Sequence, residues 1–210
     1  NIFIACLAAK EPVFGLAVDL GTTKIAAYLV DLESNKIAAQ SSAMNPQINY
    51  GEDVISRILY CMENDDGRKI MQEKVIETLN LLIQTMSKNL PIQNSNIIQA
   101  VVVGNTLMHH FFTGLPVKQL GLSPFLPAVK HAMKLNAKKL GLSISPMAEI
   151  YTPENIAGYV GGDHVAMMLA VDAVDVVQHR SDGRTFSRPG HTCQQHHPLI
   201  VVTQSFHCIG

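Results

Sequence analysis

Apolar residues gather in strand-length blocks at the start of the chain. Val13–Leu20 is almost entirely apolar, and Ile25–Val30 follows after only four residues. Because Gly21–Lys24 must reverse the chain between these blocks, we expect an antiparallel hairpin. Lys36–Ala43 can add a third antiparallel strand after a reversal at Glu33–Asn35. The pattern therefore predicts a sheet that opens as a three-strand antiparallel meander.

Apolar residues then recur every three or four positions, which is typical of helices. Gly51–Asp53 opens the first helix with acidic residues, which suit a helix N-terminus. The apolar residues expected on one face of this helix are Val54, Ile55, Ile58, Leu59 and Met62. Those of a second helix, which we expect to stop at Pro91, are Met71, Val75, Leu79, Leu82, Met86 and Leu90.

A strand that leads directly into a helix follows. Ile97–Val103 is a continuous apolar run of the kind buried on both faces of a sheet. Gly104–Thr106 breaks the run, and helical spacing resumes at Leu107, Met108, Phe111 and Phe112. Ligands of open α/β sheets bind at such junctions, where a helix N-terminus faces outward from the end of a strand.

Glycine and proline interrupt the regular pattern further along. Residues 114–153 contain five prolines, so we expect loop and short helix inserted into the lobe. Asn155–Asp163 forms a second glycine-rich turn before an amphipathic helix. The residues of that helix expected to face inward are Val165, Met168, Leu169 and Val176. The predicted fold class is α/β, with a mixed sheet flanked by helices.

Composition narrows the class of protein. At 210 residues, 47% of them hydrophobic, the chain can bury a substantial core. Its 16 basic and 17 acidic residues leave a net charge of −1, so nucleic acid is not an expected partner. No apolar run approaches the ~20 residues that span a bilayer, so we expect no membrane anchor. The four scattered cysteines fit a cytoplasmic protein and lack the spacing of an iron–sulfur site.

The reversal between the first two strands is the strongest candidate for chemistry. Glycine lets backbone N–H groups approach an anion closely, and threonines add hydroxyl donors. The turn therefore predicts phosphate binding by Gly21, Thr22, Thr23 and Lys24. Asp19, at the end of the preceding strand, would repel phosphate without an intervening cation, which makes it a candidate Mg²⁺ ligand. An ordinary hairpin, in which Asp-x-Gly only makes the turn, would explain the same residues.

Two further turns supply candidates for the lining of a cleft: Gly104, Asn105, Thr106, Gly161 and Gly162. Asn105 and Thr106 could equally serve only as helix caps. Asp163 either caps its own helix or holds a metal-bound water opposite Asp19, so it is a second candidate Mg²⁺ ligand. The sequence identifies no catalytic base.

Two pairs of residues favour structural interpretations. Side chains of His109 and His110 point about 100° apart on a helix, so we expect one packed and one exposed. Asp53 and Arg57 lie four residues apart, and we expect them to pair on the helix surface.

Three downstream segments carry a resemblance to a known family: Ser42–Ile58, Val101–His110 and Asn155–Ala166. With the hairpin, they resemble the ATPase domain of reductive activators of corrinoid proteins, within the acetate and sugar kinase, Hsp70 and actin superfamily. The resemblance extends over roughly residues 13–177, far more than a lone glycine pattern. It implies that 13–177 is the first lobe of an actin-like, ribonuclease H-like ATPase domain. We interpret 1–12 as a linker remnant, because its apolar start lacks the basic region of a signal peptide.

The resemblance also implies a function. Such activators use ATP and Mg²⁺ to return inactivated cobalt(II) corrinoid proteins to cobalt(I), with electrons from an iron–sulfur module elsewhere in the polypeptide. The implied partner is a corrinoid protein, and a homodimer is compatible with this assignment. Because ATP is clamped between two lobes in this fold, we expect the chain alone to bind ATP weakly and to lack significant ATPase activity. A small-molecule kinase of the same superfamily and a non-catalytic docking module are alternative functions.

The composition changes at the end of the chain. Residues 178–210 contain five of the nine histidines and two of the four cysteines, with no lysine or glutamate. This tail lacks the second Asp-x-Gly phosphate motif that the superfamily resemblance implies. A shifted reading frame and a disordered segment are the two interpretations we favour for it. Zinc binding is a third, although the Cys193-x-x-His196 spacing matches no standard zinc module.

Overall fold

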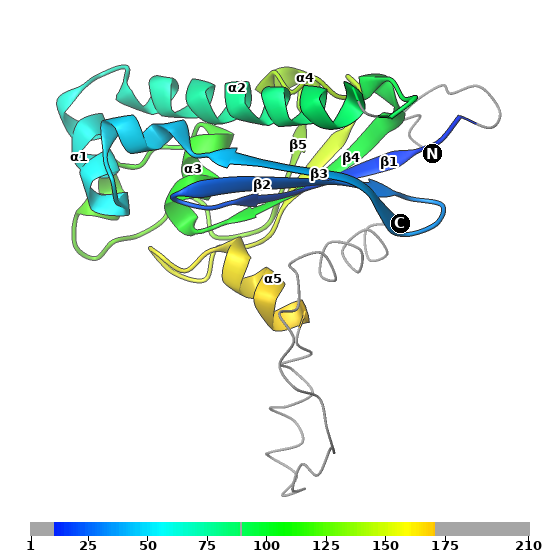
Figure 1. Cartoon of the computed structure of the whole chain (residues 1–210). Helices are drawn as coiled ribbons and strands as arrows, with labels where there is room; N and C mark the ends of the chain where they lie inside the picture. Colours follow the sequence, from blue (N-terminus) through cyan, green and yellow to red (C-terminus); the bar gives the residue numbers. More distant parts are fainter. Residues whose placement is uncertain (1–10, 89, 171–210) are drawn as a thin grey trace, which may run out of the picture.

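One mixed sheet organises the computed structural model, which describes residues 11–88 and 90–170 (Figure 1). Its strand order is β3-β2-β1-β4-β6-β5. The strands are β1 (Phe14–Leu20), β2 (Lys24–Asp31), β3 (Lys36–Met44), β4 (Ile97–Gly104), β5 (Met133–Asn136) and β6 (Glu149–Thr152). The α-helices are α1 (Val54–Glu63), α2 (Gly67–Lys88), α3 (Thr106–Thr113), α4 (Ala137–Leu140) and α5 (Gly162–Ala170). Short 3₁₀ helices are η1 (Pro46–Tyr50), η2 (Asn94–Asn96) and η3 (Lys118–Gly121).

The predicted antiparallel meander is confirmed. β1 pairs antiparallel with β2, and β2 pairs antiparallel with β3. On its other side β1 runs parallel to β4, and β4 runs parallel to β6. Leu20 and Gly104 are register partners, so the carboxyl ends of β1 and β4 lie side by side. The sheet therefore brings two predicted turns to the same edge.

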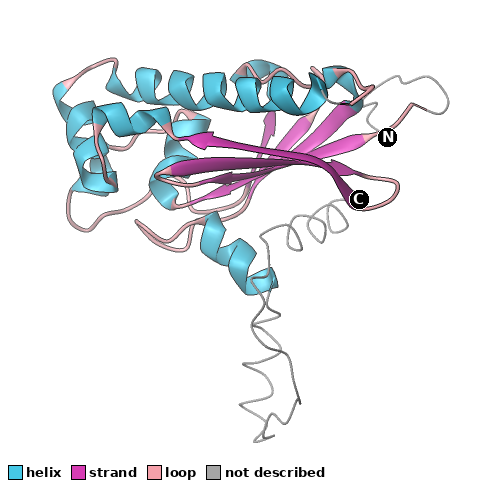
Figure 2. Ribbon diagram, viewed as in Figure 1, coloured by secondary structure: helices cyan, strands magenta, loops and turns pink. Residues whose placement is uncertain are grey.

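The two faces of the sheet are covered by different helices (Figure 2). Side chains alternate along β1, so that Leu16, Val18 and Leu20 join a large core while Ala17 joins a smaller one on the opposite face. The large core includes Met71, Val75, Leu79, Leu82 and Met86 of α2, as the helical spacing predicted. The smaller core is covered by Ala166 of α5. Asp19 shares the α5 face because it lies two residues after Ala17.

The sequence pattern missed two strands. Residues 114–153 were expected to form loop and short helix, yet they also contain β5 and β6, which extend the main sheet. Each strand has four residues, too few to show a clear period of two. β6 is instead defined by its parallel pairing with β4.

Two predictions about helix faces were wrong. On α5, Met168 and Leu169 are exposed, while Ala166 is buried against the sheet. On α1, Ile55, Leu59 and Met62 are exposed, and Ile58 is buried. Val176 and the whole tail 178–210 lie outside the described residues. Among residues 11–88 and 90–170, no helix has both the length and the apolar character needed to cross a bilayer.

Leu79 provides a direct test of the α2 packing. Its side chain is fully buried, so Leu79→Ala should lower the free energy of unfolding by about 2–5 kcal/mol in urea titrations. Leu81→Ala is the matched control, because Leu81 lies on the same helix and is 58% exposed. The control should stay within about 0.5 kcal/mol of the unmodified chain. Equal losses in the two variants would contradict this placement of α2.

Candidate functional site

The turn between β1 and β2 is built around a glycine that no other residue can replace. The N–H of Gly21 donates to the carbonyl of Lys24 at 3.0 Å. A Cβ atom on Gly21 would lie 2.5 Å from that same carbonyl oxygen, closer than any real side chain allows. The close approach that defines the turn therefore requires glycine at this position.

The other carbonyl groups of the turn are held by donors from residues later in the chain. The Asn45 side-chain amide donates to the Gly21 carbonyl at 2.9 Å, and the Asn45 backbone N–H donates to the Thr23 carbonyl at 2.8 Å. Nη2 of Arg57 donates to the Thr22 carbonyl at 2.8 Å. The conformation of the turn is thus fixed from one side, with every carbonyl from Gly21 to Lys24 engaged.

This anchoring leaves donors free on the opposite side of the turn. In a trans peptide the C=O of one residue and the N–H of the next point in opposite directions. Engaging the carbonyls of Gly21 and Thr22 therefore turns the N–H groups of Thr22 and Thr23 away from Asn45 and Arg57. Neither N–H donates to an acceptor in the part of the chain that the structure describes. Adjacent outward-facing N–H groups form a concavity suited to an anion.

Asn105 joins this turn to the N-terminus of α3. Its side-chain carbonyl accepts from the N–H of Met108 at 3.0 Å, so Asn105 caps the helix. Its side-chain amide donates to the hydroxyl of Thr22 at 2.9 Å. Because that hydroxyl accepts from Asn105, its own hydrogen is available to a ligand. Asn105 thus both caps α3 and orients a candidate phosphate donor.

Glycines allow the second and third turns to close around the first. A Cβ on Gly104 would lie 2.8 Å from the Leu20 carbonyl, and one on Gly161 would lie 2.5 Å from the Gly104 carbonyl. A Cβ on Gly162 would contact Pro153 at 3.2 Å. The ends of β1 and β4 and the starts of α3 and α5 therefore converge, which brings together the residues predicted to line a cleft. Lys24 is exposed beside them.

Thr106 has a structural role here. Its side chain is fully buried, and its hydroxyl donates to the Ala157 carbonyl at 2.6 Å. This bond ties the loop before α5 to α3 and occupies the hydroxyl. Thr106 therefore stabilises the packing of this loop against α3 and has no free hydroxyl for a ligand.

Two carboxyl groups, those of Asp19 and Asp163, lie near enough to interact at this edge of the sheet. Burial raises the pKa of Asp19, and the nearby negative charge of Asp163 raises it further. Asp163 lies in the first turn of α5, where its side chain accepts from the N–H and the ring of His164. Two like charges brought together beside N–H donors favour a cation between them.

These residues fit Mg²⁺ as a ligand set. Mg²⁺ in nucleotide sites is held by one or two carboxylates together with phosphate oxygens and waters. No group of three or more His, Cys, Asp or Glu side chains suited to a metal occurs in residues 11–88 and 90–170. Asp19 and Asp163 would be the two carboxylates of such a nucleotide-bound metal.

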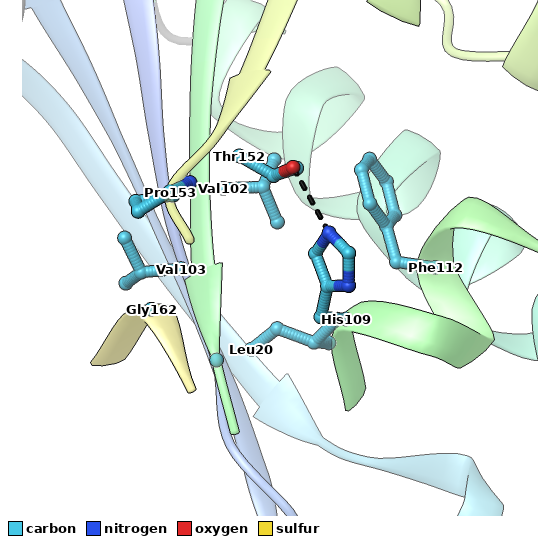
Figure 3. A pocket seen from close by; sticks show the side chains of 9 residues that line it. Leu20, Val102, Val103, His109, Phe112, Thr152, Pro153 and Gly162 are labelled. Atoms are coloured by element: carbon cyan, nitrogen blue, oxygen red, sulfur yellow. Dashed lines mark hydrogen bonds between the residues drawn. The ribbon is translucent and has the colours of Figure 1, made fainter. Parts of the chain in front are cut away.

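A buried histidine pair lies behind the site, so the prediction of one exposed histidine was wrong. His109 and His110 are 5% and 0% exposed. The side-chain amide of Asn155 donates to Nδ1 of His109 at 3.0 Å, so the other ring nitrogen donates to the Thr152 hydroxyl at 3.0 Å (Figure 3). Together these contacts connect α3 with the end of β6 and the loop before α5.

His110 takes the opposite tautomer. Its Nδ1 donates to the carbonyl of Thr106 at 2.7 Å, and its Nε2 accepts from the N–H of Ala128 at 2.9 Å. Both imidazoles are therefore neutral. Burial lowers the pKa of each ring, to about 4 for His109. The hydrogen-bond partners of the two rings lie in α3, at the end of β6 and in loops, and none of them belongs to the turn of Gly21–Lys24.

The sequence prediction missed Asn45 and Arg57 as parts of the site. Arg57 was expected to pair with Asp53, but Asp53 instead caps α1 by accepting from the N–H of Ser56 at 2.7 Å. Arg57 forms no ion pair within the described part of the chain. Both residues lie in the segment 42–58 that carried the family resemblance. The resemblance of this segment to the family was therefore the one sequence feature that could have pointed to Asn45 and Arg57.

Most of the chain is similar to proteins that activate corrinoid proteins. Residues 14–175 match the model of a family described as the RACo middle region. The chain is 37% identical over 169 residues to the corrinoid activation enzyme RamQ of Eubacterium limosum, covering 80% of this chain and 28% of that protein. A solved structure of a reductive activator for corrinoid, iron–sulfur protein has a TM-score of 0.75 and 38% identity, covering 77% of this chain and 26% of that one. The chain therefore spans little more than a quarter of the length of these relatives.

The partly buried Asp19 carboxylate should reduce the stability of the fold near neutral pH. Its pKa is raised, so its ionised form is disfavoured in the folded state at neutral pH. Asp19→Asn should raise Tm near neutral pH, because the neutral amide avoids the penalty that burial and the charge of Asp163 impose on the carboxylate. Asp65→Asn, at an exposed position, is the control and should leave Tm unchanged. A lower Tm for Asp19→Asn would contradict the assigned environment.

The histidine pair should make stability depend on pH. The folded pKa of His109, about 4, lies below its ordinary 6.5, so the unfolded chain binds more protons between these values. Stability should therefore fall as pH decreases, with His109 contributing a loss of about 2 kcal/mol between about pH 7 and about pH 5. Urea titrations at several pH values should show a weaker dependence for His109→Gln, and no change for His131→Gln at an exposed position. An identical pH dependence in all three proteins would rule out a buried neutral His109.

Proposed function

Since this chain belongs to the RACo middle-region family, we propose that it is the phosphate-binding lobe of an ATP-dependent reductive activator of corrinoid proteins. In this proposal the lobe belongs to an actin-like ATPase domain, and ATP is the ligand of the turn Gly21–Lys24. The activator returns inactivated cobalt(II) corrinoid to cobalt(I). Its relatives include a corrinoid activation enzyme and a reductive activator for corrinoid, iron–sulfur protein.

The observation that carries the proposal is the set of outward-facing donors on one turn. The N–H groups of Thr22 and Thr23 and the hydroxyl of Thr22 face away from the donors that hold the turn. Such a group of donors binds phosphate oxygens without needing a catalytic side chain. Asp19 and Asp163 would hold Mg²⁺ beside the phosphates, where the ion would neutralise charge.

The site suits a conformational ATPase better than a phosphoryl transferase. Both rings of the His109–His110 pair are hydrogen-bonded to groups outside the turn, and in this proposal Asp19 and Asp163 hold the metal. ATP can drive electron transfer to cobalt only if it binds two conformations of the activator unequally. The bonds from Asn105 to Thr22 and from Thr106 to Ala157 give the ligand such a route, because they connect the turn to α3 and to the loop before α5.

The proposal extends to groups outside the described residues. We propose that the electrons come from an iron–sulfur module elsewhere in the whole activator, and that the partner is a corrinoid protein. The active ATP site would require a second lobe that closes on the nucleotide. The isolated chain should therefore bind ATP weakly.

Replacement of the matching segment of RamQ by residues 14–175 of this chain tests the proposal. The chimaera should form cobalt(I) from a cobalt(II) corrinoid protein in an ATP-dependent manner, followed by cobalt absorption. Asp19→Asn in the chimaera should reduce the rate by roughly 100-fold, the scale of losing one preorganised electrostatic contact. Asp65→Asn should retain the rate.

Two results would contradict the proposed function. One is a folded chimaera in which cobalt(I) forms equally fast without ATP. The other is full activity of the Asp19→Asn chimaera, which would separate the turn from ATP use. Circular dichroism checks that each chimaera is folded. Because Asp19→Asn is expected to stabilise the lobe, a lower rate in this variant would not be explained by unfolding.

A further inference from the structure

Arg57 is a buried cation without a buried anion. Its side chain is fully buried on α1, where Ile55 and Leu59 are exposed. Burying a charged group is costly, and a buried ion pair is often no more stable than apolar residues of similar size. Packing alone would be met by methionine or leucine at this position. Packing therefore does not explain why a guanidinium group is buried at this position.

All hydrogen-bond acceptors of Arg57 are neutral. Nε donates to the Gly51 carbonyl at 2.8 Å and Nη2 to the Thr22 carbonyl at 2.8 Å. Nη1 donates to the side-chain oxygen of Gln47 at 3.3 Å and lies 3.7 Å from the sulfur of Met108. No carboxylate of residues 11–88 and 90–170 is within ion-pair distance.

The nearest acid in sequence cannot neutralise this charge at close range. Asp53 is exposed, and its carboxylate accepts from the N–H and hydroxyl of Ser56 at the start of α1. Burial lowers the pKa of Arg57 and the negative charge of Asp53 acts against that shift, but no ion pair joins the two side chains. One of the neutral groups that the guanidinium contacts is the peptide between Thr22 and Thr23.

That peptide connects the guanidinium to the candidate phosphate site. Arg57 donates to the Thr22 carbonyl, and the N–H on the same peptide, that of Thr23, points in the opposite direction. A hydrogen bond to a carbonyl polarises its amide and strengthens the amide N–H as a donor. An anion bound by Thr23 would thus receive both a stronger donor and the charge behind it.

We propose that Arg57 is a positioning residue of the phosphate turn: it orients the turn by binding the Thr22 carbonyl, and it places a positive charge behind the peptide that would face the anion. This inference rests on the proposed phosphate-binding role of the turn. It also explains what the segment Ser42–Ile58 does: its residues hold carbonyl groups of the turn. Asn45 holds the carbonyls on both sides of the one that Arg57 holds.

Titration of the ¹⁵N-labelled 210-residue chain with magnesium tripolyphosphate tests the inference, followed through the amide signals of Thr22 and Thr23. Arg57→Met should weaken binding roughly tenfold or more, a loss of about 1.4 kcal/mol. Arg57→Lys should weaken it less, because lysine keeps the charge but lacks the guanidinium fork. Arg68→Met, which removes an exposed arginine of α2, should bind as the unmodified chain does.

The charge of the ligand separates positioning from general damage to the fold. In Arg57→Met the affinity ratio between tripolyphosphate and monophosphate should fall, because a missing positive charge matters most for the more highly charged anion. A purely structural defect would weaken both ligands by the same factor and would overturn the inference. If Arg57→Met does not fold, Arg57→Lys decides: it should be at least about threefold weaker with its circular dichroism unchanged.

The outcomes distinguish this inference from the proposed function. If the unmodified chain shows no change at Thr22 and Thr23, the phosphate turn fails, and the role of Arg57 fails with it. If the unmodified chain binds and the folded Arg57 variants bind equally well, only the role of Arg57 is overturned. Weaker binding with a reduced ligand ratio supports both.

Discussion

The site depends on one constraint, the anchoring of the turn between β1 and β2 through its carbonyl groups. Asn45 and Arg57 hold three of these carbonyls, and the Gly21 N–H holds that of Lys24. Because a peptide presents its N–H opposite its C=O, donors for an anion are created by binding acceptors elsewhere. The residues that shape the site therefore need not touch the ligand.

The surrounding fold supports this turn by close backbone approach. Gly104 and Gly161 have no room for a side chain, so the ends of β1 and β4 and the start of α5 meet within backbone contact distance. Asn105 links α3 to Thr22, and Asp163 reaches the electrostatic environment of Asp19 from α5. Three chain segments thus converge at the carboxyl edge of the parallel strands, where ligands bind in open α/β sheets.

Sequence periodicity predicted the strands and helices that have a long run of regularly spaced buried residues. It failed for elements and residues that are defined by contacts with parts of the chain far away in sequence. The meander and α2 follow from apolar spacing, whereas β6 (Glu149–Thr152) is too short to show a period and is defined by pairing with β4. Asn45 and Arg57 contact the turn from 24 and 35 residues away, so no local pattern reveals them. One of His109 and His110 was expected to be exposed, because the loop partner of His110, the N–H of Ala128, has no sequence signal. The turn itself was predictable because its glycine, threonines and acid are adjacent.

The most direct test is a crystal structure of the chain with magnesium and tripolyphosphate. The account predicts phosphate oxygens within hydrogen-bond distance of the N–H groups of Thr22 and Thr23, with a metal between the anion and Asp19. The Arg57 guanidinium should remain on the Thr22 carbonyl, on the far side of the peptide from the anion. Anion density elsewhere, with the turn of Gly21–Lys24 bare at saturating ligand, would contradict it.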